Sequence, residues 1–138
     1  MNGVSGESQD RNMETIREFY AAFCEGDFVR MNAILSPDLT LYEAEGLPYG
    51  GTYRGHEGFR EVMTKLLDHF DGVEPVDLKI AAVDDLVMAY MTLLGTARAT
   101  GRKLEMPLCE VWKFRDGQIL EGRLLYFDTH AVRQICGM

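Results

Sequence analysis

The sequence lacks the long apolar stretches and the basic surface that mark several classes of protein. Its longest apolar run, residues 86–94, is far shorter than the roughly 20 residues that a membrane-spanning helix needs. Lys and Arg number 14 against 22 Asp and Glu, and the resulting net charge of −8 repels phosphate backbones and anionic membrane surfaces. We therefore expect no nucleic-acid partner and no membrane association.

Cysteines, targeting signals and cofactor motifs are also scarce. The three cysteines are widely spaced and odd in number, which fits a reducing compartment better than a disulfide framework. The polar start of the chain lacks the apolar centre of a signal peptide, so we expect a soluble, cytoplasmic protein. No metal-ligand spacing, phosphate loop, dinucleotide fingerprint or nucleophile elbow occurs, so we expect neither a metal nor another cofactor.

What remains is the composition of one folded domain. Apolar residues make up 46% of the 138 residues and charged residues 26%, as in ordinary globular proteins. Residues 1–12 show no period that could bury a face, so we predict a disordered N-terminal tail followed by a domain over residues 13–138.

Helical periodicity predicts three helices in the first half of the chain. An apolar stripe runs through residues 16–24 and ends at Gly26, and Asp27 is placed to cap a second, short helix. A third stripe covers residues 59–70. The glycine-rich loop over residues 46–51 carries large side chains, so we expect it to cover or border something.

The second half alternates as strands do. The predicted strands here cover residues 78–82, 86–100, 104–114 and 119–127, and one further strand is predicted in the first half, over residues 39–45. Short turns rich in Asp and Gly join them, which predicts an antiparallel sheet, with bulges at Gly95 and Gly122. Residues 86–94 are apolar at nearly every position, so we expect both faces to be covered, one by helices and one by a second copy in a homodimer.

Two carboxylates interrupt the apolar face of this sheet. By alternation Glu110 shares a face with Trp112, and Glu43 shares one with Leu41. Two acids near one apolar cavity would divide into an ionised base and a protonated hydrogen-bond donor, which suits proton transfer. The alternatives are an ion pair between Glu110 and Arg123, or solvation of Glu43 at its strand end.

Further candidates carry weaker signals. Asp128 is either the N-cap of a short C-terminal helix or an acid of the site, and Tyr126 is either a pocket residue or part of the dimer surface. The large apolar side chains that would line a cavity for a ring-shaped ligand, or else fill the core, are Phe19, Tyr20, Phe23, Tyr53, Phe59, Met63, Met106, Trp112 and Phe114.

Besides the order of these elements, five short sequence segments are informative: IREFYAAFCEGDF, LSPDLTLYE, GTYRGHEGF, EVWKFRDGQI and LLYFD. Together they make residues 13–135 resemble the SnoaL-like branch of the nuclear transport factor 2-like superfamily, which includes ketosteroid isomerases and polyketide cyclases. The resemblance implies an α+β fold, with a cone-shaped, curled antiparallel sheet around three N-terminal helices and a short C-terminal helix. It also implies an apolar pocket at the open end and dimerisation through the outer face of the sheet.

Comparison with the ketosteroid isomerases implies a role for each acid. Glu43 falls at the position of their carboxylate base, and Glu110 at that of the protonated acid that binds the enolate oxygen. Phe19 stands at the position of their hydrogen-bonding tyrosine, and Tyr20 points roughly 100° away around the helix.

We therefore expect a cofactor-independent enzyme, an isomerase or aldol-type cyclase, that acts on a small apolar carbonyl compound. One glutamate removes a proton next to the carbonyl and the other stabilises the enolate. Tyr126 or Tyr53 would supply the hydroxyl that Phe19 lacks. The alternative is a non-catalytic module that uses the same cone to hold a hydrophobic ligand or to dimerise.

Overall fold

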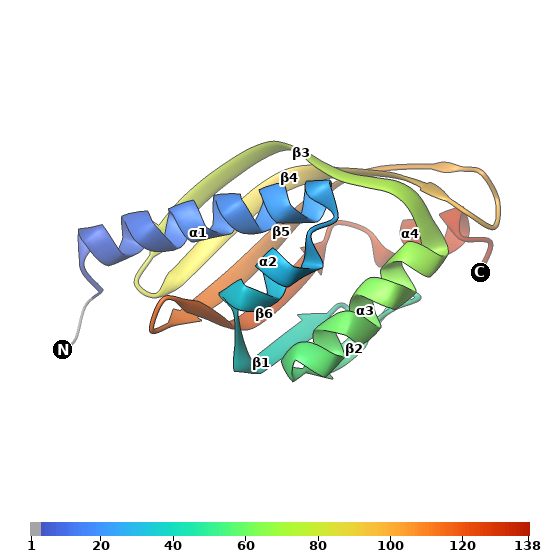
Figure 1. Ribbon diagram of the computed structural model, residues 1–138. Coiled ribbons are helices and arrows are strands. Elements are labelled where there is room, and N and C mark those ends of the chain that lie inside the picture. Colours follow the sequence, from blue (N-terminus) through green and yellow to red (C-terminus); the bar gives the residue numbers. More distant parts are fainter. Residues whose placement is uncertain (1–3) are drawn as a thin grey trace.

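The computed structural model describes residues 4–138, which form an α+β fold (Figure 1). The helices are α1 (Gly6–Glu25), α2 (Phe28–Ile34), α3 (Gly55–His69) and α4 (Thr129–Ile135). The strands are β1 (Leu35–Glu43), β2 (Gly51–Arg54), β3 (Phe70–Val83), β4 (Leu86–Ala97), β5 (Lys103–Arg115) and β6 (Gln118–Tyr126). They form one sheet in the order β2-β1-β6-β5-β4-β3.

The sheet curls around the helices without closing on itself (Figure 1). Helix α1 packs on β3 and β4, whereas α3 packs on β1 and β2, so the two helices cover opposite ends of the concave face. The predicted cone around three N-terminal helices, followed by a short C-terminal helix, is confirmed. No helix in the described part of the chain is long and apolar enough to cross a membrane.

The sheet is mixed rather than antiparallel throughout, which corrects the prediction. Strands joined by short turns pair antiparallel, but β1 and β6 run parallel. These two strands lie far apart in sequence, so no hairpin sets their relative direction. Strand β2 was not predicted, because its four residues are too few to show alternation.

The N-terminal boundary also differs from the prediction. Helix α1 begins at Gly6, so the prediction of a disordered tail is wrong for residues 6–12. Ser5 caps this helix, its side-chain oxygen accepting from the backbone N–H of Ser8 at 3.1 Å. This turn is held by capping rather than by an apolar stripe, which is why periodicity missed it. Residues 1–3, the start of the predicted tail, lie outside the described residues.

Gly122 lets a large ring lie flat against the sheet. An added Cβ would lie 2.5 Å from the Trp112 ring and 2.7 Å from Leu41. The predicted bulge at Gly122 is wrong, because the pairing register runs through this position and shifts only beyond Glu121. At Gly95 the pairing of β4 with β5 runs on without a shift, but the pairing of β3 with β4 does shift there, with two residues of β3 opposite Gly95. The glycine at 122 therefore serves the close approach of a side chain and not an insertion in the strand.

Gly122→Ala is expected to lower the free energy of unfolding by about 1–3 kcal/mol, since Trp112 and Leu41 must move to admit the methyl group. Urea unfolding measures the loss. Gly95→Ala is the matched control, because a Cβ there meets nothing closer than 3.6 Å. Equal losses in the two variants would contradict the role given to Gly122.

Candidate active site

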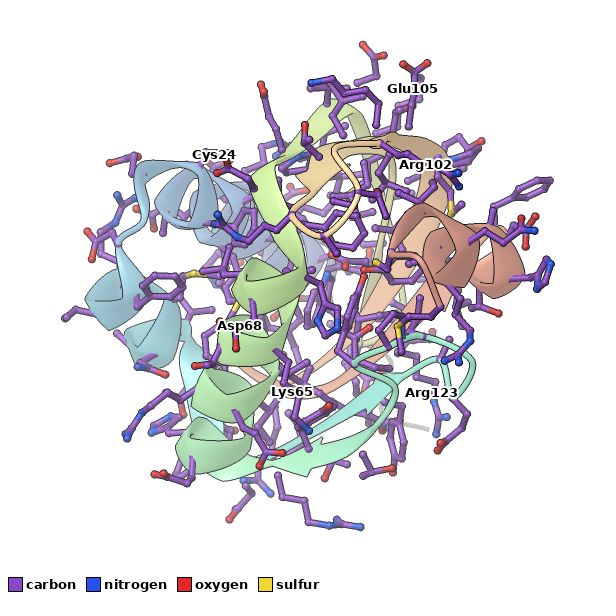
Figure 2. All side chains as sticks on the ribbon, turned by 90° about the vertical axis from the view of Figure 1, so that its right-hand side faces the viewer. Cys24, Lys65, Asp68, Arg102, Glu105 and Arg123 are labelled. Carbon is purple, nitrogen blue, oxygen red and sulfur yellow. The ribbon has the colours of Figure 1, made fainter. Side chains whose placement is uncertain are left out.

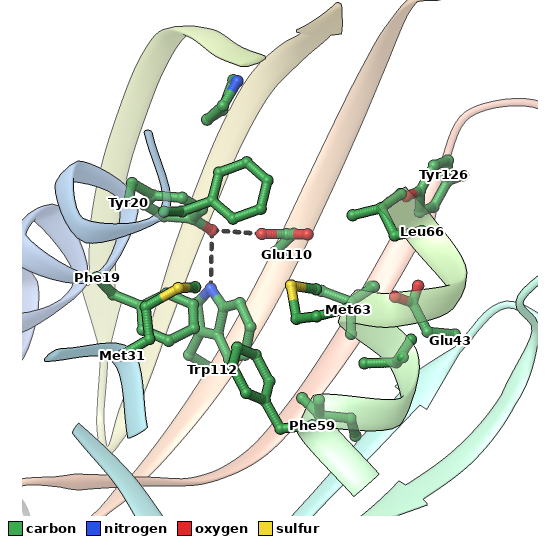
Figure 3. Close-up of a pocket in the computed structure, with 15 residues that line it drawn as sticks. Phe19, Tyr20, Met31, Glu43, Phe59, Met63, Leu66, Glu110, Trp112 and Tyr126 are labelled. Atoms are coloured by element: carbon green, nitrogen blue, oxygen red, sulfur yellow. Dashed lines mark hydrogen bonds between the residues drawn. The ribbon is translucent and has the colours of Figure 1, made fainter. Parts of the chain in front are cut away.

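An apolar cavity of about 70 Å³ lies between the helices and the inner face of the sheet (Figure 3). The predicted residues that line it are Phe19, Tyr20, Phe23, Glu43, Phe59, Met63, Glu110, Trp112 and Tyr126. Lining residues that the sequence reasoning did not single out are Met31, Leu41, Val62, Leu66, Pro75 and Leu124. Both unexpected carboxylates of the apolar face therefore reach one cavity.

Three predicted ligand-binding residues lie in the core instead. Met106 and Phe114 are on the inner face of β5, as alternation predicted. The cavity meets β5 at Glu110 and Trp112, and Met106 and Phe114 lie outside this stretch, one toward each end of the strand. Tyr53 is buried and its hydroxyl donates to the backbone oxygen of Tyr49 at 2.9 Å. Alternation identifies a face of a strand but not which part of that face a cavity will meet.

Asp128 does not line the cavity. It is exposed and is the N-cap of α4, where its carboxylate accepts from the backbone N–H of Ala131 at 3.0 Å. Of the two alternatives left open for Asp128, the geometry supports the helix cap and gives no support to a site acid.

Glu110 takes part in a chain of hydrogen bonds across the cavity wall (Figure 3). The Tyr20 hydroxyl donates to Glu110 Oε1 at 2.6 Å, and the Trp112 indole N–H donates to the Tyr20 oxygen at 2.9 Å. The alternative of an ion pair with Arg123 does not hold, because that guanidinium pairs with Glu121 at 3.0 Å.

The position of Tyr20 corrects one expectation drawn from the resemblance. Although Phe19 and Tyr20 are about 100° apart around the helix, both rings are buried and both line the cavity. The apolar stripe of α1 is wide enough to include both positions, and the long phenol ring reaches Glu110 from its edge. A tyrosine hydroxyl is therefore present here, supplied by the neighbouring residue.

Glu43 lies on the far side of the cavity from Tyr20 (Figure 3). Only 8% of its surface is exposed, and among the described residues no group hydrogen-bonds to its Oε1 atom. Burial raises the pKa of Glu43 well above its ordinary value, and the charge of Glu110 raises it further. An acid in this setting holds its proton more strongly than an exposed glutamate does.

Glu110 differs from Glu43 because a hydrogen-bond donor opposes the effect of burial on its pKa. Burial raises the pKa of Glu110 to about 7, while the hydrogen bond from Tyr20 opposes that rise by stabilising the carboxylate. Burial also raises the pKa of Tyr20 well above its ordinary value, so its hydroxyl stays protonated and donates. Of the two acids, Glu110 is the one that ionises near neutral pH.

Tyr126 brings a second hydroxyl to the cavity, close to Glu43 (Figure 3). Its oxygen lies 2.8 Å from the hydroxyl of Tyr49, a residue of the loop between β1 and β2. Tyr49 is 1% exposed. The loop that was expected to cover or border something therefore contacts the cavity lining through Tyr49, although none of its own residues lines the cavity.

The site offers little to a metal ion. Throughout residues 4–138, His, Cys, Asp and Glu side chains nowhere gather in groups of three suited to hold one. What the arrangement offers is two acids of different proton affinity and two phenols, in apolar surroundings.

The fold and this cavity define a class of protein: a cone-shaped α+β domain with an acid-lined apolar pocket. The SnoaL-like domain model matches residues 16–122, which is more than half of the chain. The chain belongs to the SnoaL-like family, which confirms the resemblance. No curated protein matches it by sequence.

Solved structures share the fold over nearly the whole chain. A nuclear transport factor 2-like protein of unknown function from Burkholderia pseudomallei is 25% identical with a TM-score of 0.86, covering 93% of this chain and 98% of that one. A nuclear transport factor 2-like protein from Burkholderia thailandensis is 26% identical with a TM-score of 0.83, and the match covers 100% of this chain and 99% of that one. A Xanthomonas campestris pv. campestris protein, provisionally named a polyketide cyclase, is 22% identical with a TM-score of 0.80, and the match covers 93% of this chain and 98% of that one.

The raised pKa of Glu110 predicts how stability depends on pH. A carboxyl group with a pKa of about 7 in the fold, against 4.5 as its ordinary value, favours folding while it is protonated and opposes it once ionised. This contribution is complete below about pH 4.5 and is lost as the pH rises through 7, with a size of about 3 kcal/mol.

Glu110→Gln is therefore expected to remove part of the stability loss between about pH 5 and pH 8, measured by urea unfolding at both values. Glu105→Gln is the matched control, since Glu105 lies on the same strand but projects outward to solvent (Figure 2). A pH dependence that is the same in wild type and Glu110→Gln would show that Glu110 ionises without penalty.

Proposed function

We propose that the protein is a cofactor-independent enzyme that removes a proton next to the carbonyl of a small, apolar, neutral compound, as an isomerase or aldol-type cyclase does. The observation that carries this proposal is that two glutamates of unequal proton affinity line one apolar cavity. Membership of the SnoaL-like family and the fold shared with a protein provisionally named a polyketide cyclase are consistent with it.

The side-chain contacts favour roles opposite to those implied by the ketosteroid isomerases. Glu110 accepts a hydrogen bond on Oε1, which stabilises its ionised form, and its other oxygen points away from Tyr20 toward the rest of the cavity (Figure 3). Among the described residues no group donates to Glu43 Oε1, and burial raises the pKa of this carboxyl, so in this proposal Glu43 keeps its proton. Glu110 is therefore the base, and Glu43 is the acid that donates to the substrate oxygen.

The reaction then runs with a constant charge in the cavity. Glu110 takes the α proton, and the electrons of the broken C–H bond delocalise into the carbonyl to form the enolate. Glu43 and Tyr126 donate hydrogen bonds to the enolate oxygen. In an isomerisation Glu110 returns the proton to another carbon of the conjugated system. In an aldol-type cyclisation the enolate carbon bonds to a second carbonyl carbon, and the new alkoxide takes the proton from Glu110.

The cavity limits what enters without rearrangement. Its volume of about 70 Å³ is that of a few water molecules, well below the usual size of ligand pockets. Met63 lies in the middle of the lining (Figure 3), and a methionine side chain adapts readily to a ligand. Compounds of one ring are therefore the first candidates.

Deuterium exchange tests proton abstraction without knowledge of the natural substrate. Wild-type protein in deuterium oxide is expected to label the α carbon of one-ring ketones, such as cyclohexenones, followed by NMR. Glu110→Gln should lower the exchange rate by about 10²–10⁴-fold, because the base is lost. Glu43→Gln should lower it less, by up to about 10³-fold, since an amide still donates.

Glu105→Gln serves as the control and should leave the rate unchanged, since that side chain is exposed on the opposite face of β5. Exchange that survives in both Glu43→Gln and Glu110→Gln would rule out the proton-transfer roles. Ketones that bind without any exchange would leave the cavity as a binding site only, which is the non-catalytic alternative.

We also propose that the protein is a homodimer through the outer face of the sheet. On that face Tyr90, Cys109 and Leu125 lie side by side on neighbouring strands. Tyr90 is 53% exposed and Leu125 is 54% exposed in the single chain. Large apolar side chains gathered on one exposed face are typical of an interface, and a second copy with the same face would cover them.

A charge placed at the centre of this outer face is expected to separate the copies. Tyr90→Glu should have the mass of one chain by light scattering, whereas wild type should have twice that mass. Val29→Glu is the control, because Val29 is 82% exposed on α2, away from the sheet. A wild-type protein with the mass of a single chain would end the dimer proposal.

A further inference from the structure

The loop residue Tyr49 is buried behind the cavity wall, and among residues 4–138 its hydroxyl group has a single hydrogen-bond partner. Tyr49 is 1% exposed, and the contact that its hydroxyl makes is with Tyr126, at 2.8 Å between the oxygens. The two rings meet edge to face, with centroids 6.1 Å apart. The pair is therefore held by packing as well as by the hydrogen bond.

Burial gives this hydrogen bond a direction. A hydroxyl hydrogen that is buried without an acceptor costs the full desolvation of that group, so the hydrogen of Tyr49 points to the oxygen of Tyr126. Tyr126 is only half-buried and lines the cavity. Its hydroxyl hydrogen can therefore be donated to a group in the cavity, which the hydroxyl hydrogen of Tyr49 cannot reach. With its oxygen accepting from Tyr49, Tyr126 is left to donate into the cavity.

We propose that Tyr49 is a positioning residue, which directs the hydroxyl of Tyr126 into the cavity and strengthens it as a donor to the carbonyl oxygen of a ligand. A hydroxyl that accepts a hydrogen bond is polarised and becomes a better donor itself. The inference rests on the proposed function, in which the ligand offers a carbonyl. It adds that the oxygen of this carbonyl lies on the side of the cavity formed by Tyr126 and Glu43.

The loop that carries Tyr49 is built to hold the ring in place. Backbone hydrogen bonds from Leu47 to Ala44 and from Gly50 to Leu47, both 3.0 Å, make two successive turns, and the second turn contains Tyr49. The hydroxyl of Tyr53 donates to the backbone oxygen of Tyr49 at 2.9 Å. A side chain on a loop fixed in this way can act as a support for a neighbour in the site.

Thermal unfolding tests the pairing without any ligand. Tyr126→Phe leaves the buried hydroxyl of Tyr49 without a partner and should lower the melting temperature by about 3 to 10 °C. Tyr49→Phe should lower it less, because Tyr126 faces the cavity. Adding Tyr49→Phe to Tyr126→Phe should recover part of the loss, since both polar groups are then gone. A double variant no more stable than Tyr126→Phe would overturn the inference.

Infrared spectroscopy of bound cyclohexenone tests whether the hydroxyl of Tyr126 donates into the cavity. In wild type the carbonyl band should move to lower frequency on binding, and Tyr49→Phe should reduce that movement and raise the Kd by about 2- to 10-fold. Tyr42→Phe, on the outer face, is the control and should match wild type. A band unchanged by Tyr49→Phe but altered by Tyr126→Phe would overturn the inference and leave the proposed function standing.

If wild type binds no one-ring ketone, the proposed function fails, and the melting temperatures still decide whether the hydroxyls of Tyr49 and Tyr126 form the pair described. If ketone binds and exchanges its α proton while the double variant shows no recovery, the proposed function holds and the role of Tyr49 is wrong. The two failures are therefore separate.

Discussion

The burial of two carboxyl groups around one apolar cavity is the constraint on which the rest of the site depends. Ionising either group there costs solvation, and ionising both adds repulsion between like charges in a medium of low dielectric constant. Burial and repulsion therefore both favour a single negative charge on the pair over two. Tyr20 favours Glu110 as the place of that charge, because its hydroxyl donates to Glu110, whereas within residues 4–138 no donor reaches Oε1 of Glu43.

The sheet positions this arrangement through a few close contacts. Glu110 and Trp112 are two residues apart on β5, so their side chains share the inner face, and the indole N–H orients Tyr20. The indole ring itself lies over Gly122 of β6, where even a methyl group would collide with it. A glycine whose only requirement is space thus helps to hold the donor that stabilises the charge on Glu110.

The sequence was most informative where a simple period applied. Alternation in the two strands placed Glu43 and Glu110 on the inner face, and turns rich in Asp and Gly predicted the hairpins. The partner of Glu110 was not predictable in this way, because Tyr20 lies on a helix and the bond depends on how α1 packs on the sheet. Tyr49 lies in a loop that has no period at all. The parallel pairing of β1 with β6 was missed for a related reason, since contact between segments distant in sequence leaves no local signal.

The charges around the cavity indicate which kind of compound suits it. Its lining, as the structure describes it, contains two glutamates and no Lys, Arg or His, in a chain whose net charge is −8. In the proposed reaction, proton transfer from a neutral substrate would move one negative charge from Glu110 to the enolate oxygen and add none, so the total charge in the cavity would stay the same. An anionic substrate would bring a second charge, with no cation to offset it and with two acids whose ionisation is already unfavourable. The electrostatics of the pocket thus select neutral compounds before any contact of shape is considered.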